Sequence, residues 1–204
     1  MQVMDYEQAE KIIRAQSKIV IAPCICRKEH RMVGKGCNHM EDGCFIFGGG
    51  AYYYEQRGIG KSVDHEEALE VLKKGIAEGL VLQTGNSLKT MNICMCCDCC
   101  CQILSYIKQT DKPSTAVNSN YFAVVNEDNC TGCGMCEQRC PMDAIAVDGI
   151  ANVNTERCIG CGLCVAVCDF DSMKLQGKDE SERWVPPATV VDTYMDILKE
   201  KGLL

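Results

Sequence analysis

The sequence predicts an α+β protein in which a small, mainly helical, cysteine-rich domain precedes a second domain of short strands. Two observations support this division. Of the 18 cysteines, ten lie before residue 112 and eight lie after it. A stretch rich in Ser, Thr, Asn and Pro at 109–120 has the composition of a linker. We therefore expect domains at 1–112 and 113–178, followed by a connector and a C-terminal helix over 179–204.

Apolar residues at helical spacing predict the helices of the first domain. Residues 5–17 and 64–79 each repeat apolar side chains along one helix face. The second helix begins at Asp64 with a glutamate three residues later, as in a capping box, and ends near Gly79. A third helix is expected to reach about residue 109, because apolar side chains recur over 103–107.

Two other segments of the chain carry weaker signals. Residues 45–54 read FIFGGGAYYY, and the run of glycines predicts irregular structure there. Near the C-terminus, an apolar stripe follows one face of a predicted helix that we expect to cover another surface. The stripe consists of Val190, Val191, Tyr194, Ile197 and Leu198.

Composition and charge exclude several classes of protein. The longest apolar run is five or six residues, far short of the roughly 20 that cross a bilayer, so we expect no membrane association. The net charge of −7 arises after residue 112, where 7 Lys and Arg face 14 Asp and Glu. Such an acidic half disfavours nucleic acid as a partner. Because the chain opens without a signal-peptide pattern, we expect a cytoplasmic protein whose thiols stay reduced.

One internal repeat has a spacing typical of metal ligands. NCTGCGMCEQRCPMDAI at 129–145 realigns with RCIGCGLCVAVCDFDSM at 157–173, and each copy contains C-x2-C-x2-C-x3-C. The first copy supplies Cys130, Cys133, Cys136 and Cys140, and the second supplies Cys158, Cys161, Cys164 and Cys168. Zinc sites use two cysteine pairs about 15 to 20 residues apart and have no need of a third cysteine so close. The spacing therefore indicates iron–sulfur clusters.

This repeat resembles the bacterial two-[4Fe-4S] ferredoxins of clostridial type, whose signature includes a proline after the fourth cysteine, here Pro141. Asp169 stands at the equivalent place in the second copy. The resemblance covers about 58 residues and implies a ferredoxin-type dicluster module with short β-hairpins. It also implies that the fourth cysteine of each run ligates the other cluster. One [4Fe-4S] cluster would then use Cys130, Cys133, Cys136 and Cys168, and the other would use Cys158, Cys161, Cys164 and Cys140.

Ten further cysteines precede the repeat, and we expect them to bind metal, including at least one more iron–sulfur cluster. They are Cys24, Cys26, Cys37, Cys44, Cys94, Cys96, Cys97, Cys99, Cys100 and Cys101. Four thiolates complete a cubane, so ten suffice for two clusters with two left over, one larger cluster, or one cluster beside an open metal position. The pattern resembles a little-characterised cysteine-rich region found ahead of ferredoxin modules. If 94–101 is helical, one turn serves two neighbouring sites.

A local positive cluster lies within the first cysteine loop. It consists of Arg27, Lys28, Arg31 and Lys35. These side chains either screen the negative charge of thiolate-bound metal or belong to an ordinary solvated loop.

Together these features predict an iron–sulfur electron-transfer protein. It would pass single electrons between a redox partner protein and a further iron–sulfur site in the N-terminal domain, with the acidic C-terminal half docking on a basic partner. One alternative is an iron–sulfur reductase whose substrate meets the N-terminal cysteines. Another is an iron–sulfur sensor in which 5–17 and 64–82 form a small winged helix, although the neutral charge of that half disfavours DNA. An electron carrier or electron-transfer subunit fits better than a stand-alone enzyme, and no catalytic residue is predicted.

Overall fold

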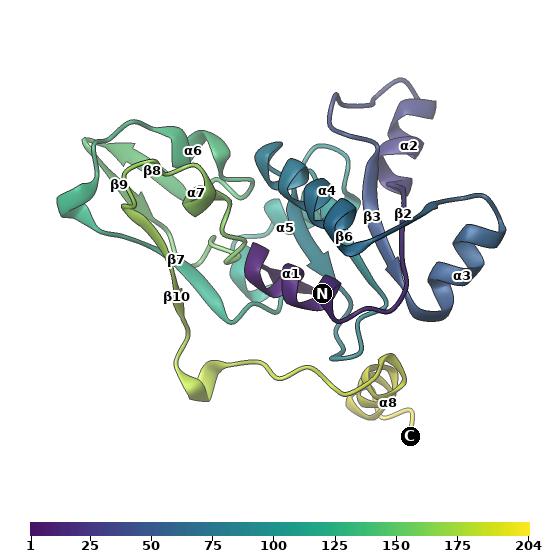
Figure 1. Ribbon diagram of the computed structural model, residues 1–204. Coiled ribbons are helices and arrows are strands. Elements are labelled where there is room, and N and C mark those ends of the chain that lie inside the picture. The colour runs from purple at the N-terminus through teal and green to yellow at the C-terminus, as the bar shows by residue number, and fades with distance from the viewer.

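The computed structural model describes all 204 residues and places a six-stranded antiparallel sheet at the centre of the first half (Figure 1). The strand order is β1-β5-β6-β3-β2-β4. The strands are β1 (Gln2–Met4), β2 (Ile19–Pro23), β3 (Asp42–Phe47), β4 (Lys61–Val63), β5 (Val81–Thr84) and β6 (Asn92–Cys96). The chain is an α+β protein, but the expected mainly helical first domain is not confirmed. Strands of three to six residues, several broken by Gly or Cys, show too little alternation to be recognised in the sequence.

The helices of this half lie on both faces of the sheet. They are α1 (Tyr6–Arg14), α2 (Ile25–Met32), α3 (Gly48–Gln56), α4 (His65–Ala77) and α5 (Gln102–Lys108). Helices α1 and α4 pack together on one face, over a core that includes Phe45, Phe47, Ile93 and Met95. This arrangement around a sheet differs from the winged helix considered above.

The opposite face of the sheet carries cysteines. Side chains alternate between the faces of a strand, so the residues between the core positions of β3 and β6 point away from α1 and α4. Cys44 and Cys94 are such residues, and they pair directly across the β3–β6 ladder. Cys96 follows two residues after Cys94 and packs in a separate core with Leu104 of α5. The sheet therefore separates two cysteine-containing environments.

Several local expectations are decided by this structure. Helix α4 is confirmed, and Asp64 caps it by accepting a hydrogen bond from the Glu67 amide at 2.8 Å. The irregular segment predicted at 45–54 is wrong, because β3 continues to Phe47 and α3 follows directly. A helix through 94–101 is also wrong: β6 ends at Cys96 and a turn precedes α5. In both cases the sheet contacts outweigh local propensity.

The second half repeats one unit of strand, cysteine loop and short helix. Strands β7 (Tyr121–Val125) and β10 (Met173–Gly177) form one antiparallel pair, and β8 (Ile145–Asp148) and β9 (Ile150–Val153) form another. Short helices α6 (Met135–Arg139) and α7 (Leu163–Ala166) follow the two cysteine loops and contact each other. Three single 3-10 turns lie at Pro113–Thr115, Glu127–Asn129 and Glu180–Glu182.

The two halves are held together by packing. The segment 109–120 is not a free linker, because Pro113 and Val117 are buried and the Asn118 amide donates to the Met1 carbonyl at 2.9 Å. After β10 an extended connector leads to α8 (Val190–Glu200), which lies apart from the half that contains β7 to β10 (Figure 1). No helix has the length and apolar character needed to span a membrane.

Candidate metal centres

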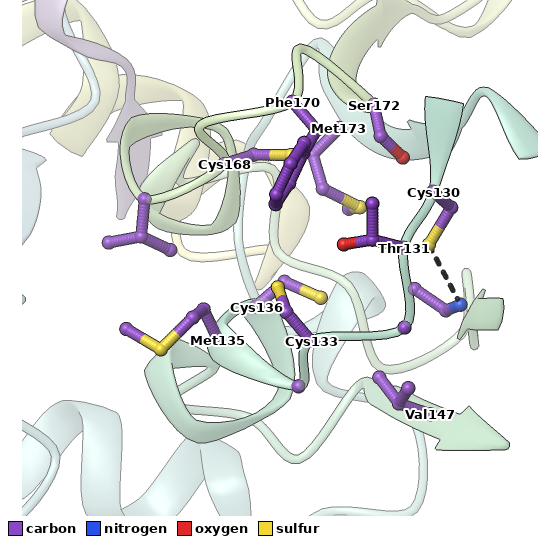
Figure 2. Close-up of a pocket in the computed structure, with 14 residues that line it drawn as sticks. Cys130, Thr131, Cys133, Met135, Cys136, Val147, Cys168, Phe170, Ser172 and Met173 are labelled. Carbon is purple, nitrogen blue, oxygen red and sulfur yellow. Dashed lines mark hydrogen bonds between the residues drawn. The ribbon is translucent and has the colours of Figure 1, made fainter. Parts of the chain in front are cut away.

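The first cavity of the second half is surrounded by four cysteines. Cys130, Cys133 and Cys136 come from the loop before α6 and from its first turn, and Cys168 is the last cysteine of the second run, just after α7. Figure 2 shows Cys168 across this cavity from Cys133 and Cys136, with Cys130 on a third side. The remaining lining is largely apolar. Three cysteines of one run thus meet the fourth cysteine of the other run.

A second cavity repeats this arrangement with the roles exchanged. It is lined by Cys158, Cys161 and Cys164 of the second run and by Cys140 of the first. Burial raises the pKa of the Cys161 thiol to about 12 and also raises the pKa of Cys164. Thiols this reluctant to ionise become good ligands only when a metal replaces the proton. The grouping of four plus four is the one that the ferredoxin resemblance implies.

The loops around both cavities suit iron–sulfur clusters in two ways: their cysteines supply the ligands, and their backbone amides bond to the cysteine sulfurs. Backbone amides donate to the cysteine sulfurs: Ala151 to Cys130 at 3.4 Å, Ala123 to Cys158 at 3.3 Å and Ala144 to Cys140 at 3.3 Å. Such N–H···S bonds stabilise negative charge on thiolates and set cluster potentials.

Glycine is required where these loops turn. Gly132 and Gly160 occupy equivalent places in the repeats with φ of +67°. A Cβ atom would collide with the carbonyl oxygen of Gly149 in the first case and of Tyr121 in the second. Positive φ and close backbone approach both exclude larger residues. The glycines of the repeat therefore shape the two loops around the cavities.

The ten cysteines of the first half separate into a group of four and a group of six. The sulfur atoms of Cys37, Cys97, Cys99 and Cys100 all lie within 4.8 Å of one another. The other six line one cavity of about 480 Å³ on the cysteine-bearing face of the sheet. These six are Cys24, Cys26, Cys44, Cys94, Cys96 and Cys101. We call the first group the four-cysteine cluster and the second the six-cysteine cavity.

Elements that are far apart in the sequence bring the six-cysteine cavity together. Pro23 ends β2 at a register shift, after which Cys24 occupies the N-cap position of α2 and Cys26 lies in its first turn. Strands β3 and β6 supply Cys44 and Cys94, whose sulfur atoms lie 3.9 Å apart. The contact between these two thiols lowers the pKa of Cys94 and raises that of Cys44.

The cysteines at the far end of β6 also interact. Interaction with Cys96 lowers the pKa of the Cys101 thiol to about 6, while Cys101 and Cys94 together with burial raise the pKa of Cys96. A thiol that ionises near neutral pH is a ready metal ligand and nucleophile. The six-cysteine cavity therefore contains thiols prepared to bind metal.

A buried arginine lies between the two cysteine groups. Arg27 is completely buried, and its Nη1 donates to the Met95 carbonyl at 3.0 Å and lies 3.8 Å from the Cys97 sulfur. Neither its Nε nor its Nη2 has a hydrogen-bond partner. The glycine at 43 makes room, because a Cβ atom there would collide with Nη2. Lys28 and Arg31 on α2 and Lys35 in the loop after it are exposed, so the positive cluster divides into one buried cation and three exposed ones.

The six-cysteine cavity and the second ferredoxin-like cavity are connected by one apolar core. Its buried members include Cys96 and Cys101 from the first half and Met142, Ile159 and Leu163 from the second. Cys94 packs against this core from one side, and Cys140, Cys158 and Cys161 pack against it from the other. The two sets of cysteines are thus joined through packed side chains that exclude water.

Comparison with protein families identifies residues 123–175 as a match to the 4Fe-4S dicluster domain. These 53 residues are about a quarter of the 204-residue chain. No curated protein matches the chain. The C-terminal half therefore contains a ferredoxin-like iron–sulfur module, which indicates an iron–sulfur electron-transfer protein.

Two residues at these sites, Gly43 and Gln83, escaped the sequence analysis. Arg27 was named there only as one member of the positive cluster, because the sequence does not distinguish it from its exposed basic neighbours. Gly43 carries no turn signal, and its role depends on Arg27 beside it. Gln83 is buried in the lining of the six-cysteine cavity with both amide atoms unpartnered. The one sequence signal that could have indicated Gln83 is an amide side chain at an inward-facing place in the period-two pattern of a strand.

Proposed function

We propose that this protein carries single electrons from a redox partner, through two ferredoxin-type [4Fe-4S] clusters, to a further iron–sulfur site in the six-cysteine cavity. The observation that carries the proposal is the apolar core shared by Cys94, Cys96 and Cys101 with Cys140, Cys158 and Cys161. Each cluster, when bound, accepts and releases one electron at a time. The protein supplies the ligands, the water-free contact and the docking surface.

The first cavity is the place where the partner docks. Cys133 is exposed, whereas Cys161, which holds the equivalent place in the second cavity, is only partly exposed. Exposed carboxylates flank the first set of ligands: Glu127, Asp128, Glu137, Asp169 and Asp171. These negative charges steer a partner with a basic face toward this end of the module.

Within the module, the two cavities share another core. Cys136 and Cys164 are buried there with Ala123, Ile145 and Met173. Cys130, Cys140, Cys158 and Cys168 pack around it. An electron would therefore pass from the partner to the first cavity, then to the second cavity and then to the six-cysteine cavity. Each of the steps within the protein runs through directly packed groups.

The test is electron delivery within the full-length protein, purified without oxygen. Two cubanes account for about eight irons, and one more cluster raises the total to at least about twelve. After flash photoreduction, we expect the signal of the ferredoxin module to appear first and the signal of the N-terminal site to follow. Cys158→Ser should leave the first cluster reducible and slow reduction of the N-terminal site at least tenfold. The control is Tyr52→Phe, a change at an exposed residue of α3 that belongs to none of the cysteine sites, and it should not slow this step.

Two results would contradict the proposal. One is a full-length protein with only eight irons and no N-terminal cluster signal. The other is reduction of the N-terminal site at an unchanged rate in the Cys158→Ser variant.

A reductase is the second candidate, because the six-cysteine cavity has room for more than metal ligands. Its 480 Å³ falls in the range of small-molecule sites. The unpartnered amide of Gln83 lines it, and α8 contributes Tyr194 and Ile197 to its wall. Reduced protein should then be reoxidised by a specific small molecule. A Gln83→Leu variant that keeps its iron should lose that turnover but still exchange electrons with the partner.

A further inference from the structure

The sulfur atoms of the four-cysteine cluster are closer together than a cubane allows. All four lie within 4.8 Å of one another, and those of Cys37 and Cys97 are 4.0 Å apart. A single tetrahedral ion with bonds of about 2.3 Å places its sulfurs about 3.8 Å apart. A cubane interposes four irons and four sulfides, which pushes its thiolates to about 6 Å apart or more. The observed spacing matches one ion.

The surroundings of the four-cysteine cluster are those of a closed metal site. Cys97 and Cys100 are buried in the core beneath α4, and Cys37 and Met40 pack against the same core. Four donors of one kind leave no position for water or substrate, as in structural sites. Only Cys99 is exposed.

The buried arginine is a second, independent observation that points to a negatively charged centre here. No carboxylate is paired with Arg27, and its nearest polar contact other than a backbone carbonyl is the Cys97 sulfur at 3.8 Å. A fully buried cation is costly unless an opposite charge compensates it. Four thiolates around a divalent ion carry a net charge of −2, so Arg27 is then a neighbour that stabilises the site.

We propose that Cys37, Cys97, Cys99 and Cys100 bind one tetrahedral metal ion, zinc or iron, in a structural site separate from the six-cysteine cavity. The ion joins the loop that follows α2 to the turn that follows β6. It thereby holds α2, whose first residues place Cys24 and Cys26 in the six-cysteine cavity. This site does not depend on the electron-transfer proposal, because it is closed and its ion need not change oxidation state.

Metal analysis of full-length protein tests the inference. We expect the double variant Cys37→Ser with Cys100→Ser to lose about one metal ion per chain and to keep the absorbance of the ferredoxin clusters. The matched control, Cys44→Ser, replaces a partly buried cysteine of the six-cysteine cavity and should keep that ion. Loss of three or four irons from the double variant, or no loss of metal, would overturn the assignment.

X-ray absorption of the unmodified protein provides a test that does not depend on a variant that folds. If the ion is zinc, the zinc edge should show four sulfur neighbours at about 2.3 Å and no nearby metal atom. If it is iron, oxidised protein should show the electron paramagnetic resonance of a single high-spin ferric ion, distinct from the cubanes. A protein that contains neither about one zinc nor this iron signal refutes the site. Failure of the electron-transfer proposal would leave these results unchanged.

Discussion

Replacing Arg27 by methionine tests whether the cysteines around it are metal-bound thiolates or neutral thiols, because the two cases predict opposite signs. Arg27 is completely buried, donates to the Met95 carbonyl at 3.0 Å and has no acidic partner. Removing one member of a buried charge pair costs about 3 to 5 kcal/mol, whereas removing an uncompensated buried charge is neutral or stabilising. With thiolates bound to metal, we expect Arg27→Met to destabilise the protein by about 3 to 5 kcal/mol.

The assay is thermal unfolding of metal-loaded protein in the absence of oxygen. For a chain of this size about 1 kcal/mol corresponds to roughly 2 to 4 °C, so the midpoint should fall by about 6 to 20 °C. Arg31→Met is the matched control, because Arg31 pairs with Glu41 at 2.7 Å in a half-exposed ion pair. Such pairs contribute about 1 kcal/mol or less. An unchanged or higher midpoint for Arg27→Met would refute the argument that negative thiolates surround Arg27.

Three further predictions concern the ferredoxin-like half and α8. Gly160→Ala should destabilise the protein by about 2 to 4 kcal/mol, since it combines positive φ with a collision against the Tyr121 carbonyl. Gly49→Ala, in a helix with open space around it, should be neutral or stabilising, and thermal unfolding compares the two. Cys140→Ala should damage the cluster held by the second cysteine run and spare its neighbour, which paramagnetic resonance resolves; loss confined to the first run's cluster would contradict cross-ligation. The double variant Tyr194→Ala with Ile197→Ala should open the six-cysteine cavity, so a chelator should remove the N-terminal iron severalfold faster. Equal rates of iron release from the variant and the unmodified protein would contradict this prediction.

The anchoring of α8 explains why the last of these variants is informative. The Thr193 hydroxyl donates to the Asn86 carbonyl at 2.7 Å, and the Leu88 amide donates to the Pro187 carbonyl at 2.8 Å. Neither bond uses the side chain of Tyr194 or Ile197, so we expect both bonds to persist when those side chains are shortened. A change in iron release therefore reports on the cover of the cavity rather than on loss of the helix.

Local sequence was sufficient for the two cysteine loops of the ferredoxin-like half, although the fourth cysteine of each cavity comes from the other run. Each loop carries its first three cysteines within seven residues, so their spacing alone places three sulfurs around one cavity. Glycine at positive φ is also a local requirement, which the sequence displays directly. The helix α4 was likewise predictable, because its cap and its apolar face are both local features.

The first half depended on long-range contacts that no local pattern reports. Six cysteines in an octet invited a helical interpretation, in which one turn serves two neighbouring sites. In the structure β6 ends at Cys96, and the following turn sends Cys97, Cys99 and Cys100 toward Cys37. This partition is decided by the sheet, whose two faces direct neighbouring residues to opposite sides.

By itself the sequence determined that the chain is α+β, that its second half has the spacing of a two-cluster ferredoxin, and that its charge is acidic there. Tertiary structure alone decided how the ten N-terminal cysteines divide and that an apolar core joins the six-cysteine cavity to the ferredoxin-like half. It also decided that Arg27, rather than its basic neighbours, is buried between them. The physical reason is that covalent connectivity sets the spacing of the metal ligands within one loop. Contacts between residues 50 to 70 positions apart are instead set by strand pairing and packing.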